Sequence, residues 1–355
     1  MRNYAHDIIT INNRKANLAD ILSGKVSSFS AFEESTFSFT TDWLKGSETY
    51  ALNTSGSTGV PKEITLTRNQ LKESARRTIA ALGLDPNDTA IVCLDTKYIA
   101  GKMMVVRAVE ANMEIIAVEP SADPFQNLTK DFPGGFVALV PLQLQEILRH
   151  PDSAQKLNTI KNVILGGAAV NASLRKEISK LKCAVHATYG MTETVSHIAL
   201  QLLNGPHASD HFTTLPGIKI HTDKRGCLVI HVPEFSEPIE TNDIIELISP
   251  NQFRWLGRFD NVINSGGFKI SPEKIEKELE RVLPDREFFV TGILDERLGE
   301  KLVLIVEGSR PNINFSKLQL HPYEIPKDVI LLPEFMRTET GKINRGKTMR
   351  LLGIG

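Results

Sequence analysis

The chain has little of what marks secreted, disulfide-bonded or membrane-spanning proteins. Its 355 residues include three cysteines, Cys93, Cys183 and Cys227, which stand far apart without paired spacing. This pattern argues against a disulfide framework or a cysteine zinc site, and favours buried thiols in a reducing, cytoplasmic compartment. Apolar runs stop at about five residues, far short of a membrane span. The N-terminus shows no apolar core of a secretory signal.

An excess of charge of one sign is also lacking. The chain has 41 lysine and arginine residues against 42 aspartate and glutamate residues, so its formal net charge is −1. Such a balance gives no general attraction for nucleic acid or for an anionic membrane. We therefore expect no nucleic-acid partner and no membrane insertion. The length exceeds that of one ordinary hydrophobic core and is sufficient for two or three domains.

Small and hydroxyl-bearing residues gather in one segment near residue 55. Glycines let backbone N–H groups approach a ligand, hydroxyls add donors, and Lys62 adds a positive charge. This composition suits an anion-binding loop, although Pro61 breaks the common phosphate-loop spacing. A flexible turn is the alternative on this segment alone. The segment is Thr54, Ser55, Gly56, Ser57, Thr58, Gly59, Val60, Pro61 and Lys62.

Short apolar runs alternate with helical periodicities from about residue 49 to 200, which predicts a parallel sheet covered by helices. The expected strands are 90–94, 115–118, 136–140, 163–165 and 184–186, and the expected helices are 101–111, 141–149 and 172–181. An earlier helix presents Leu71, Ala75, Ile79 and Leu82 and stops at Gly83.

From about residue 215 the pattern becomes β, with a hairpin turn at 223–226, and a small unit with a helix capped by Ser271 follows. The expected fold class is α/β. A large N-terminal domain (1–258) with a layered parallel-type sheet and a small β subdomain would precede a small mobile α+β domain (259–355).

Five motifs, in this order, resemble the adenylate-forming superfamily of acyl-CoA synthetases, luciferases and peptide-synthetase adenylation domains. They are TSGSTGVPK at 54–62, GGA at 166–168, YGMTE at 189–193, GRFDNVINSGGFKISPEKIE at 257–276 and TGKINR at 340–345. The resemblance implies that a carboxylic acid is joined to AMP from ATP with Mg²⁺, and that the acyl group then passes to coenzyme A.

The resemblance also assigns a nucleotide site. Thr192 is expected at the α-phosphate and Glu193 at Mg²⁺, although this pair also suits a plain helix start. Arg258 is expected to bind the nucleotide, and a surface ion pair is its alternative role. The chain departs from many relatives at Ala187, where they have Asn, and at Asn242, where they have Gly. The expected ATP-binding residues are Thr54, Ser55, Gly56, Ser57, Thr58, Gly59, Lys62, Gly166, Gly167, Ala168, Tyr189, Gly190, Asp243 and Arg258.

Catalysis is assigned by the same resemblance to Lys342, whose ammonium would bridge the attacking carboxylate and the α-phosphate. The terminal domain would then swing about Asp260 and present Gly266 and Gly267 to the thiol arm of coenzyme A. Without that resemblance, a lysine in a basic tail is ordinarily only solvated, and a glycine pair ordinarily marks a turn.

For the acid, the likeness is to the o-succinylbenzoate–CoA ligase family of menaquinone synthesis. It rests on YGMTETVSHIAL at 189–200 and on the helix around residues 100–107. Arg107, with Gly190 and Ser196, is expected to bind the acid, and Arg107 would meet its distal carboxylate. A buried structural ion pair is the alternative role of Arg107. Tyr98 stands where many relatives have His, which weakens the assignment of this acyl pocket.

Only about fifty residues precede the predicted phosphate loop, fewer than in typical relatives. Either the protein is a compact variant, or a second copy covers the sheet, and from this we hypothesise a homodimer. Other functions remain open: a ligase for a different acid, an enzyme that stops at the adenylate, a non-catalytic protein that binds AMP or an acyl-adenylate, or a scaffold.

Overall fold

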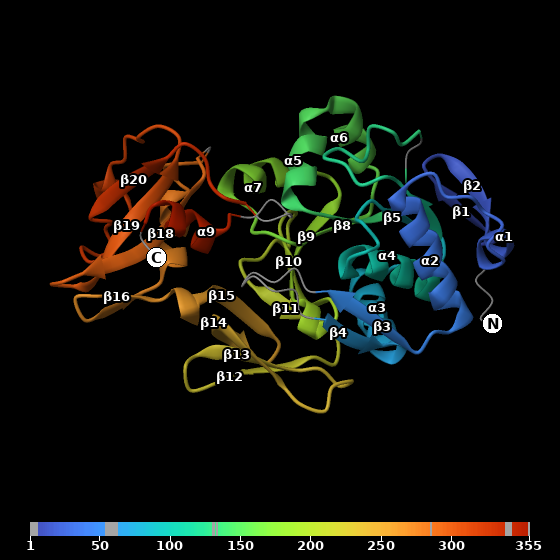
Figure 1. Cartoon of the computed structure of the whole chain (residues 1–355), viewed down its shortest axis with the longest axis horizontal. Helices are drawn as coiled ribbons and strands as arrows, with labels where there is room; N and C mark the ends of the chain where they lie inside the picture. Colours follow the sequence, from blue (N-terminus) through green and yellow to red (C-terminus); the bar gives the residue numbers. More distant parts are fainter. Residues whose placement is uncertain are drawn as a thin grey trace. The chain divides into compact units, whose positions relative to one another are not determined.

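The computed structural model describes residues 6–53, 63–129, 132, 134–284, 286–337 and 343–353 (Figure 1). The chain divides into two compact units. The first comprises Met1–Val170, Lys176–Lys219 and His231–Ile239, and the second comprises Asn171–Arg175, Ile220–Ile230 and Glu240–Gly355. The domain boundary predicted at residue 258, beyond which residues 259–355 would form a small mobile domain, stays a prediction. Within the described ranges, no helix is both long and apolar enough to cross a bilayer.

The main sheet of the first unit runs in the order β11-β10-β9-β8-β7-β5-β6-β1-β2. From β9 to β1 each neighbouring pair is parallel, and the strands at either end add antiparallel pairs. Every residue of β5, β7 and β8 is buried, as expected for parallel strands covered on both faces. The predicted α/β class is confirmed.

The strands of this sheet are β1 (Ile8–Ile11), β2 (Arg14–Asn17), β5 (Thr89–Val92), β6 (Glu114–Ala117), β7 (Phe136–Leu139), β8 (Asn162–Leu165), β9 (Ala184–Gly190), β10 (His197–Leu202) and β11 (Phe212–Thr214). A separate antiparallel pair consists of β3 (Thr49–Asn53) and β4 (Glu63–Thr67). The helices are α1 (Leu18–Leu22), α2 (Ala31–Lys45), α3 (Arg68–Leu82), α4 (Ile99–Ala111), α5 (Pro141–Arg149), α6 (Pro151–Leu157) and α7 (Ala172–Ile178), the last divided between the two units.

Helix α3 lies beside α4, and α4 packs against β5 (Figure 1). A capping box of Thr67 and Gln70 starts α3, and Gly83 ends it in the left-handed region, as the sequence predicts. One position of the predicted apolar stripe of α3 is only partly buried. Thr78 is fully buried on the inner face, whereas Ile79 is only half-buried. A polar side chain therefore lies where the periodicity predicts an apolar one.

The strands of the second unit are hydrogen-bonded in two sets. The first, in the order β12-β13-β14-β15, includes the predicted hairpin between β12 and β13. The other runs β17-β16-β19-β18, and β20 pairs with β19. The elements are β12 (Lys219–Thr222), β13 (Cys227–His231), β14 (Ile239–Ser249), β15 (Gln252–Arg258), β16 (Ile263–Ser265), β17 (Phe268–Ile270), α8 (Pro272–Leu279), β18 (Phe288–Asp295), β19 (Gly299–Glu307), β20 (Asp328–Leu332) and α9 (Arg345–Leu351).

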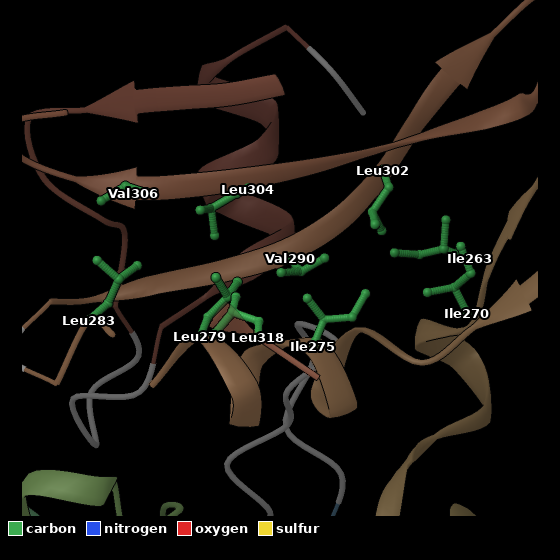
Figure 2. Close-up of a cluster of buried hydrophobic side chains, with 10 residues drawn as sticks. All are labelled: Ile263, Ile270, Ile275, Leu279, Leu283, Val290, Leu302, Leu304, Val306 and Leu318. Carbon is green, nitrogen blue, oxygen red and sulfur yellow. The ribbon is translucent and has the colours of Figure 1, made fainter. Parts of the chain in front are cut away.

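Strand β19 carries the longest apolar run of this unit, Leu302–Val306, and both of its faces are buried. Leu302, Leu304 and Val306 point toward the α8 side chains Ile275 and Leu279 (Figure 2). The alternate residues of β19 pack with Phe289 and Phe335 in a second cluster, which the α9 residue Met349 joins. The run lacks a polar alternation because a helix packs against each face.

Ser271 lies at the predicted N-cap position of α8, yet its side chain does not make the predicted capping bond. Its hydroxyl lies instead 3.3 Å from the Leu256 carbonyl oxygen and 3.1 Å from Glu273 Oε2. The start of α8 therefore depends on Pro272 at its first position, which has no N–H group to satisfy.

A buried carboxylate attaches the N-terminal hairpin to α2. Glu33 is 2% exposed and accepts hydrogen bonds from Arg14 Nη2 (2.5 Å), Asn12 Nδ2 (2.8 Å) and the Phe29 N–H (2.8 Å). Burial by itself raises the pKa of Glu33, but these donors outweigh it and hold the pKa below its usual value of 4.5.

We expect Glu33→Gln to lower the free energy of unfolding at neutral pH by about 1–2 kcal/mol, because hydrogen bonds to a charged group are lost. The pKa of Glu33 is lower in the folded state, so the stabilisation is present above pH 4.5 and is lost as the pH falls. Urea unfolding at pH 7 and below pH 4 measures this. An equal difference between the variant and wild type at both pH values would contradict it.

Candidate active site

Helix α4 carries a guanidinium group inside the first unit. Arg107 is 2% exposed and lies in a helical turn whose neighbours Val105, Val106 and Ala108 are fully buried. Burial lowers the pKa of Arg107 to about 9, so the group is still charged at neutral pH. A buried charge is costly unless it is paired, and this makes the partners of Arg107 the central question of the site.

Arg107 has hydrogen-bond partners but no acidic one. Its Nη2 donates to Ser196 Oγ at 2.7 Å and lies 3.5 Å from His197 Nδ1. Its Nε is buried and has no hydrogen-bond partner in the described part of the chain. None of the ion pairs formed among the described residues includes Arg107, and its pKa is lowered by burial with no neighbouring acid to raise it. The structural ion pair considered as an alternative from the sequence is therefore not formed within these ranges.

Ser196 reaches Arg107 from an unusual turn. Strand β9 ends at Gly190, the short 3₁₀ helix η1 (Thr192–Thr194) follows, and β10 begins at His197. Between them, Val195 has φ 69° and ψ −56°, and the Ser196 N–H donates to the Thr194 carbonyl oxygen at 2.8 Å. This is a γ-turn centred on a β-branched residue, a conformation that costs on the order of 1–3 kcal/mol. Strain of this kind is typical of a segment whose side chains are held for function.

Gly190 is packed directly against Ser196 and His197. It pairs with His197 in the β9–β10 register, and a Cβ atom at Gly190 would lie 2.4 Å from His197 Cα and 2.5 Å from the Ser196 carbonyl oxygen. Only glycine fits there. The structure therefore brings together Arg107, Gly190 and Ser196, the three residues predicted for the acid.

Two further residues of this cluster were missed from the sequence. His197 and Thr78 are buried, and His197 Nε2 lies 3.1 Å from Thr78 Oγ1. Burial lowers the pKa of His197 well below its usual range, and the neighbouring charges of Arg107 and His186 lower it further. The available signal was a threonine among the buried positions of the amphipathic helix α3, together with the histidine that follows Ser196.

The nucleotide-binding residues predicted in the first unit follow two adjacent parallel strands. Gly166, Gly167 and Ala168 come after β8, while Thr192 and Glu193 come after β9. Because β8 and β9 are parallel, these segments leave the same edge of the sheet. Tyr189 lies on β9, and its ring is 5.8 Å from that of Phe212.

Glu193 is exposed, and within the described ranges its carboxylate forms neither a hydrogen bond nor an ion pair. A carboxylate that is open in this way suits Mg²⁺, a hard cation that takes oxygen ligands. The donor chemistry at this edge of the sheet therefore fits the predicted metal.

In the second unit, Asp243 and Arg258 are partners across β14 and β15. Asp243 Oδ1 accepts a hydrogen bond from Trp255 Nε1 at 3.1 Å. Arg258 forms an exposed ion pair with Asp260 at 2.8 Å, and Asp260 also accepts from Asn242 Nδ2 at 3.2 Å. These two residues, both predicted to bind ATP, therefore lie together, and the predicted hinge residue Asp260 contacts Arg258.

Gly266 and Gly267 form the two-residue turn between β16 and β17, with φ values of 57° and 84°. Both values lie in the left-handed region that favours glycine. A Cβ atom at Gly267 would meet no atom within 4 Å. The predicted phosphate loop (residues 54–62) and Lys342 lie outside the described residues. Arg337 and Ile343 pair as an isolated antiparallel bridge on either side of residues 338–342.

Comparison with known proteins gives a family match over most of the first unit. The model of the AMP-binding enzyme family matches residues 18–224. The 2-succinylbenzoate–CoA ligase of Lactococcus lactis subsp. lactis is 27% identical, over 93% of this chain and 78% of that protein. The probable 2-succinylbenzoate–CoA ligase of Mycobacterium tuberculosis is 26% identical, over 84% of this chain and 83% of that protein.

Solved structures agree with the fold. An acyl-CoA synthetase (AMP-forming)/AMP-acid ligase II-like protein from Dyadobacter fermentans is 41% identical, with a TM-score of 0.65 over 93% of this chain and 97% of that one. The o-succinylbenzoate CoA synthetase of Bacillus subtilis, in complex with its acyl-adenylate intermediate, has a TM-score of 0.68 at 21% identity, over 84% of this chain and 68% of that one. Together with the order of the motifs, these matches confirm the predicted superfamily: the chain belongs to the AMP-binding enzymes.

Proposed function

We propose that this chain is an AMP-forming acid–CoA ligase that activates o-succinylbenzoate, as in menaquinone synthesis. The observation that carries the proposal is the buried guanidinium of Arg107, which contacts Ser196 and has no acidic partner among the described residues. The names of the Lactococcus lactis and Mycobacterium tuberculosis relatives point to the same acid, 2-succinylbenzoate.

The chemistry of the acid matches this site. o-Succinylbenzoate carries two carboxylates, one of which becomes activated while the other stays anionic. A second carboxylate placed at Arg107 would satisfy the buried charge and occupy the unused Nε donor. An acid with only one carboxylate leaves Arg107 unpaired. The expected difference in binding free energy between acids with one and with two carboxylates is large, because a charge that is buried without a partner is costly.

For the first half-reaction, a carboxylate oxygen attacks the α-phosphorus of ATP, the bond to the bridging oxygen breaks, and pyrophosphate leaves. In our proposal the 54–59 loop and Lys62 hold the outer phosphates, Thr192 donates to the α-phosphate, and Glu193 holds Mg²⁺. Bound Mg²⁺ lowers the repulsion between the two anions. Lys342 adds positive charge at the transferred group.

For the second half-reaction, the thiolate of coenzyme A attacks the acyl carbon of the adenylate, and AMP leaves. We assign the passage of the thiol arm to Gly266 and Gly267, and the pivot between the two half-reactions to Asp260, with 259–355 as the moving domain. We expect the protein to act in the cytoplasm. The homodimer stays a prediction that sedimentation velocity at micromolar concentration tests.

The test is product analysis after the protein is mixed with Mg-ATP, coenzyme A and o-succinylbenzoate. We expect pyrophosphate, AMP and o-succinylbenzoyl-CoA. Pyrophosphate should require Mg-ATP and the acid, and the thioester should require coenzyme A as well. Pyrophosphate release without thioester would indicate an enzyme that stops at the adenylate. Activity with other acids but not with this one would contradict the proposed substrate, and no turnover with any acid would indicate a binding protein.

We expect Gly267→Leu to leave pyrophosphate release within about threefold of wild type and to block thioester formation, because a bulky side chain would fill the path of the thiol arm. Single-turnover assays of the two steps measure this. Gly267→Ala is the matched control, since it carries the same left-handed backbone cost at φ 84° without the bulk. Normal thioester output from the Leu variant would show that the thiol enters elsewhere.

A further inference from the structure

Arg107 has an internal neighbour, His197, to which the sequence motifs assign no role. His197 Nδ1 lies 3.5 Å from Arg107 Nη2 and 3.4 Å from Ser196 Oγ. A guanidinium group has only N–H donors. The ring nitrogen that faces it must therefore be the one without a hydrogen atom.

The opposite side of the ring leads to the same tautomer. His197 Nε2 lies 3.1 Å from Thr78 Oγ1, and the Thr78 hydroxyl donates to the Ser74 carbonyl oxygen at 3.3 Å. A hydroxyl has one hydrogen atom, so once it donates to Ser74 it can only accept from the ring. Nε2 must then carry the hydrogen, and the imidazole is neutral with a bare Nδ1.

In this series of contacts each group donates a hydrogen bond to the next, from Arg107 through His197 and Thr78 to the backbone of α3. Its side chains are buried, which favours the neutral imidazole, and burial lowers the pKa of His197 well below its usual range. A neutral acceptor orients the guanidinium without cancelling its charge. A carboxylate in the same place would form a buried ion pair and compensate that charge from within the protein.

We propose that His197 is a positioning residue that holds Arg107 while leaving its positive charge for the ligand, and that it thereby makes the site selective for acids with a second carboxylate. The selectivity rests on the proposed function, since it requires that the acid binds at Arg107. The register of β10 shifts between His197 and Ala199, so the strand is irregular at the residue that carries the imidazole.

The tautomer is measured without reference to activity. In protein labelled with ¹⁵N-histidine, we expect the His197 signal at neutral pH to show a protonated Nε2 and a bare Nδ1, and His197→Asn identifies the signal by its loss. A protonated Nδ1, or an imidazolium at neutral pH, would overturn the inference, because such a ring cannot accept from Arg107.

Selectivity is measured as the ratio of kcat/KM for o-succinylbenzoate to that for β-benzoylpropionate, the same acid without its ring carboxylate. We expect His197→Asp to lower this ratio about 30-fold, mainly through KM for the diacid, because the new carboxylate compensates Arg107. In His197→Asn the amide oxygen replaces Nδ1 as a neutral acceptor, and we expect the ratio to stay within about threefold of wild type.

His186→Asn is the matched control, since it removes another imidazole from the adjacent strand β9 and should leave the ratio unchanged. Thermal melting and ATP binding identify any variant that has not folded. A folded His197→Asp protein with an unchanged ratio would overturn the inference while the proposed function stands. Wild-type protein that releases no pyrophosphate with o-succinylbenzoate would overturn the proposed function and the selectivity with it, and the tautomer would still decide the contact with Arg107.

Discussion

Arg107→Met should reduce kcat/KM for o-succinylbenzoate about 100-fold, because a charge-assisted contact to the second carboxylate is lost in a buried site. Turnover of β-benzoylpropionate, which keeps only the carboxylate of the succinyl chain, should stay within about threefold of wild type. Pyrophosphate release measured over a range of concentrations of each acid tests this. If both acids are affected alike, the contact between Arg107 and the second carboxylate is wrong.

The same substitution has an opposite expected effect on stability. Arg107 is a buried charge with an unused donor, and methionine has a similar length and no charge. We expect Arg107→Met to raise the free energy of unfolding by about 1–3 kcal/mol in the absence of ligand. Urea unfolding measures it, with Arg107→Lys as the control that keeps the charge. A loss of stability in the methionine variant would indicate that Arg107 serves the fold rather than the acid.

Lys342→Ala should lower the rate of adenylation about 1,000-fold, because its ammonium is expected to neutralise repulsion between the carboxylate and the α-phosphate. Thioester formation from supplied acyl-adenylate should continue, since Lys342 is expected to leave the site before that step. The two half-reactions are measured separately, by pyrophosphate release and by thioester output.

Lys347→Ala is the control for Lys342. Lys347 is an exposed lysine of the nearby helix α9, and its removal changes the charge of the tail equally. Both half-reactions should stay at the wild-type rate in this variant. Equal loss of both half-reactions in Lys342→Ala would contradict the separation of the two steps by domain rotation.

The central elements of the fold could be predicted because their sequence pattern is local. The buried strands β5, β7 and β8 differ by no more than two residues at either end from the apolar runs that predict them. The N-terminal strands escaped prediction because β1 is completed by pairs such as Ile9 with Ile115, far away in the sequence. Single-sequence periodicity carries no information on such a partner.

The candidate site divides in the same way. The motifs predict that Arg107, Gly190 and Ser196 bind the acid, but only the fold shows that β9 and β10 bring them together. The contact between His197 and Thr78 could not be predicted, because it depends on which face of α3 turns inward and on the irregular register of β10. Periodicity favoured Ile79 for that face, and a shift by one position exchanges an apolar side chain for a hydroxyl.

The neutral partner of Arg107 also bears on how the choice of acid can change during evolution. Histidine and aspartate codons differ by a single nucleotide, so one point mutation at position 197 would place a compensating charge behind the guanidinium. Ser196, Gly190 and the backbone of the turn would remain in place. A single base change in a gene that encodes this cluster would therefore weaken the preference of the ligase for diacids over monoacids. A duplicated gene could acquire a new substrate by that one change.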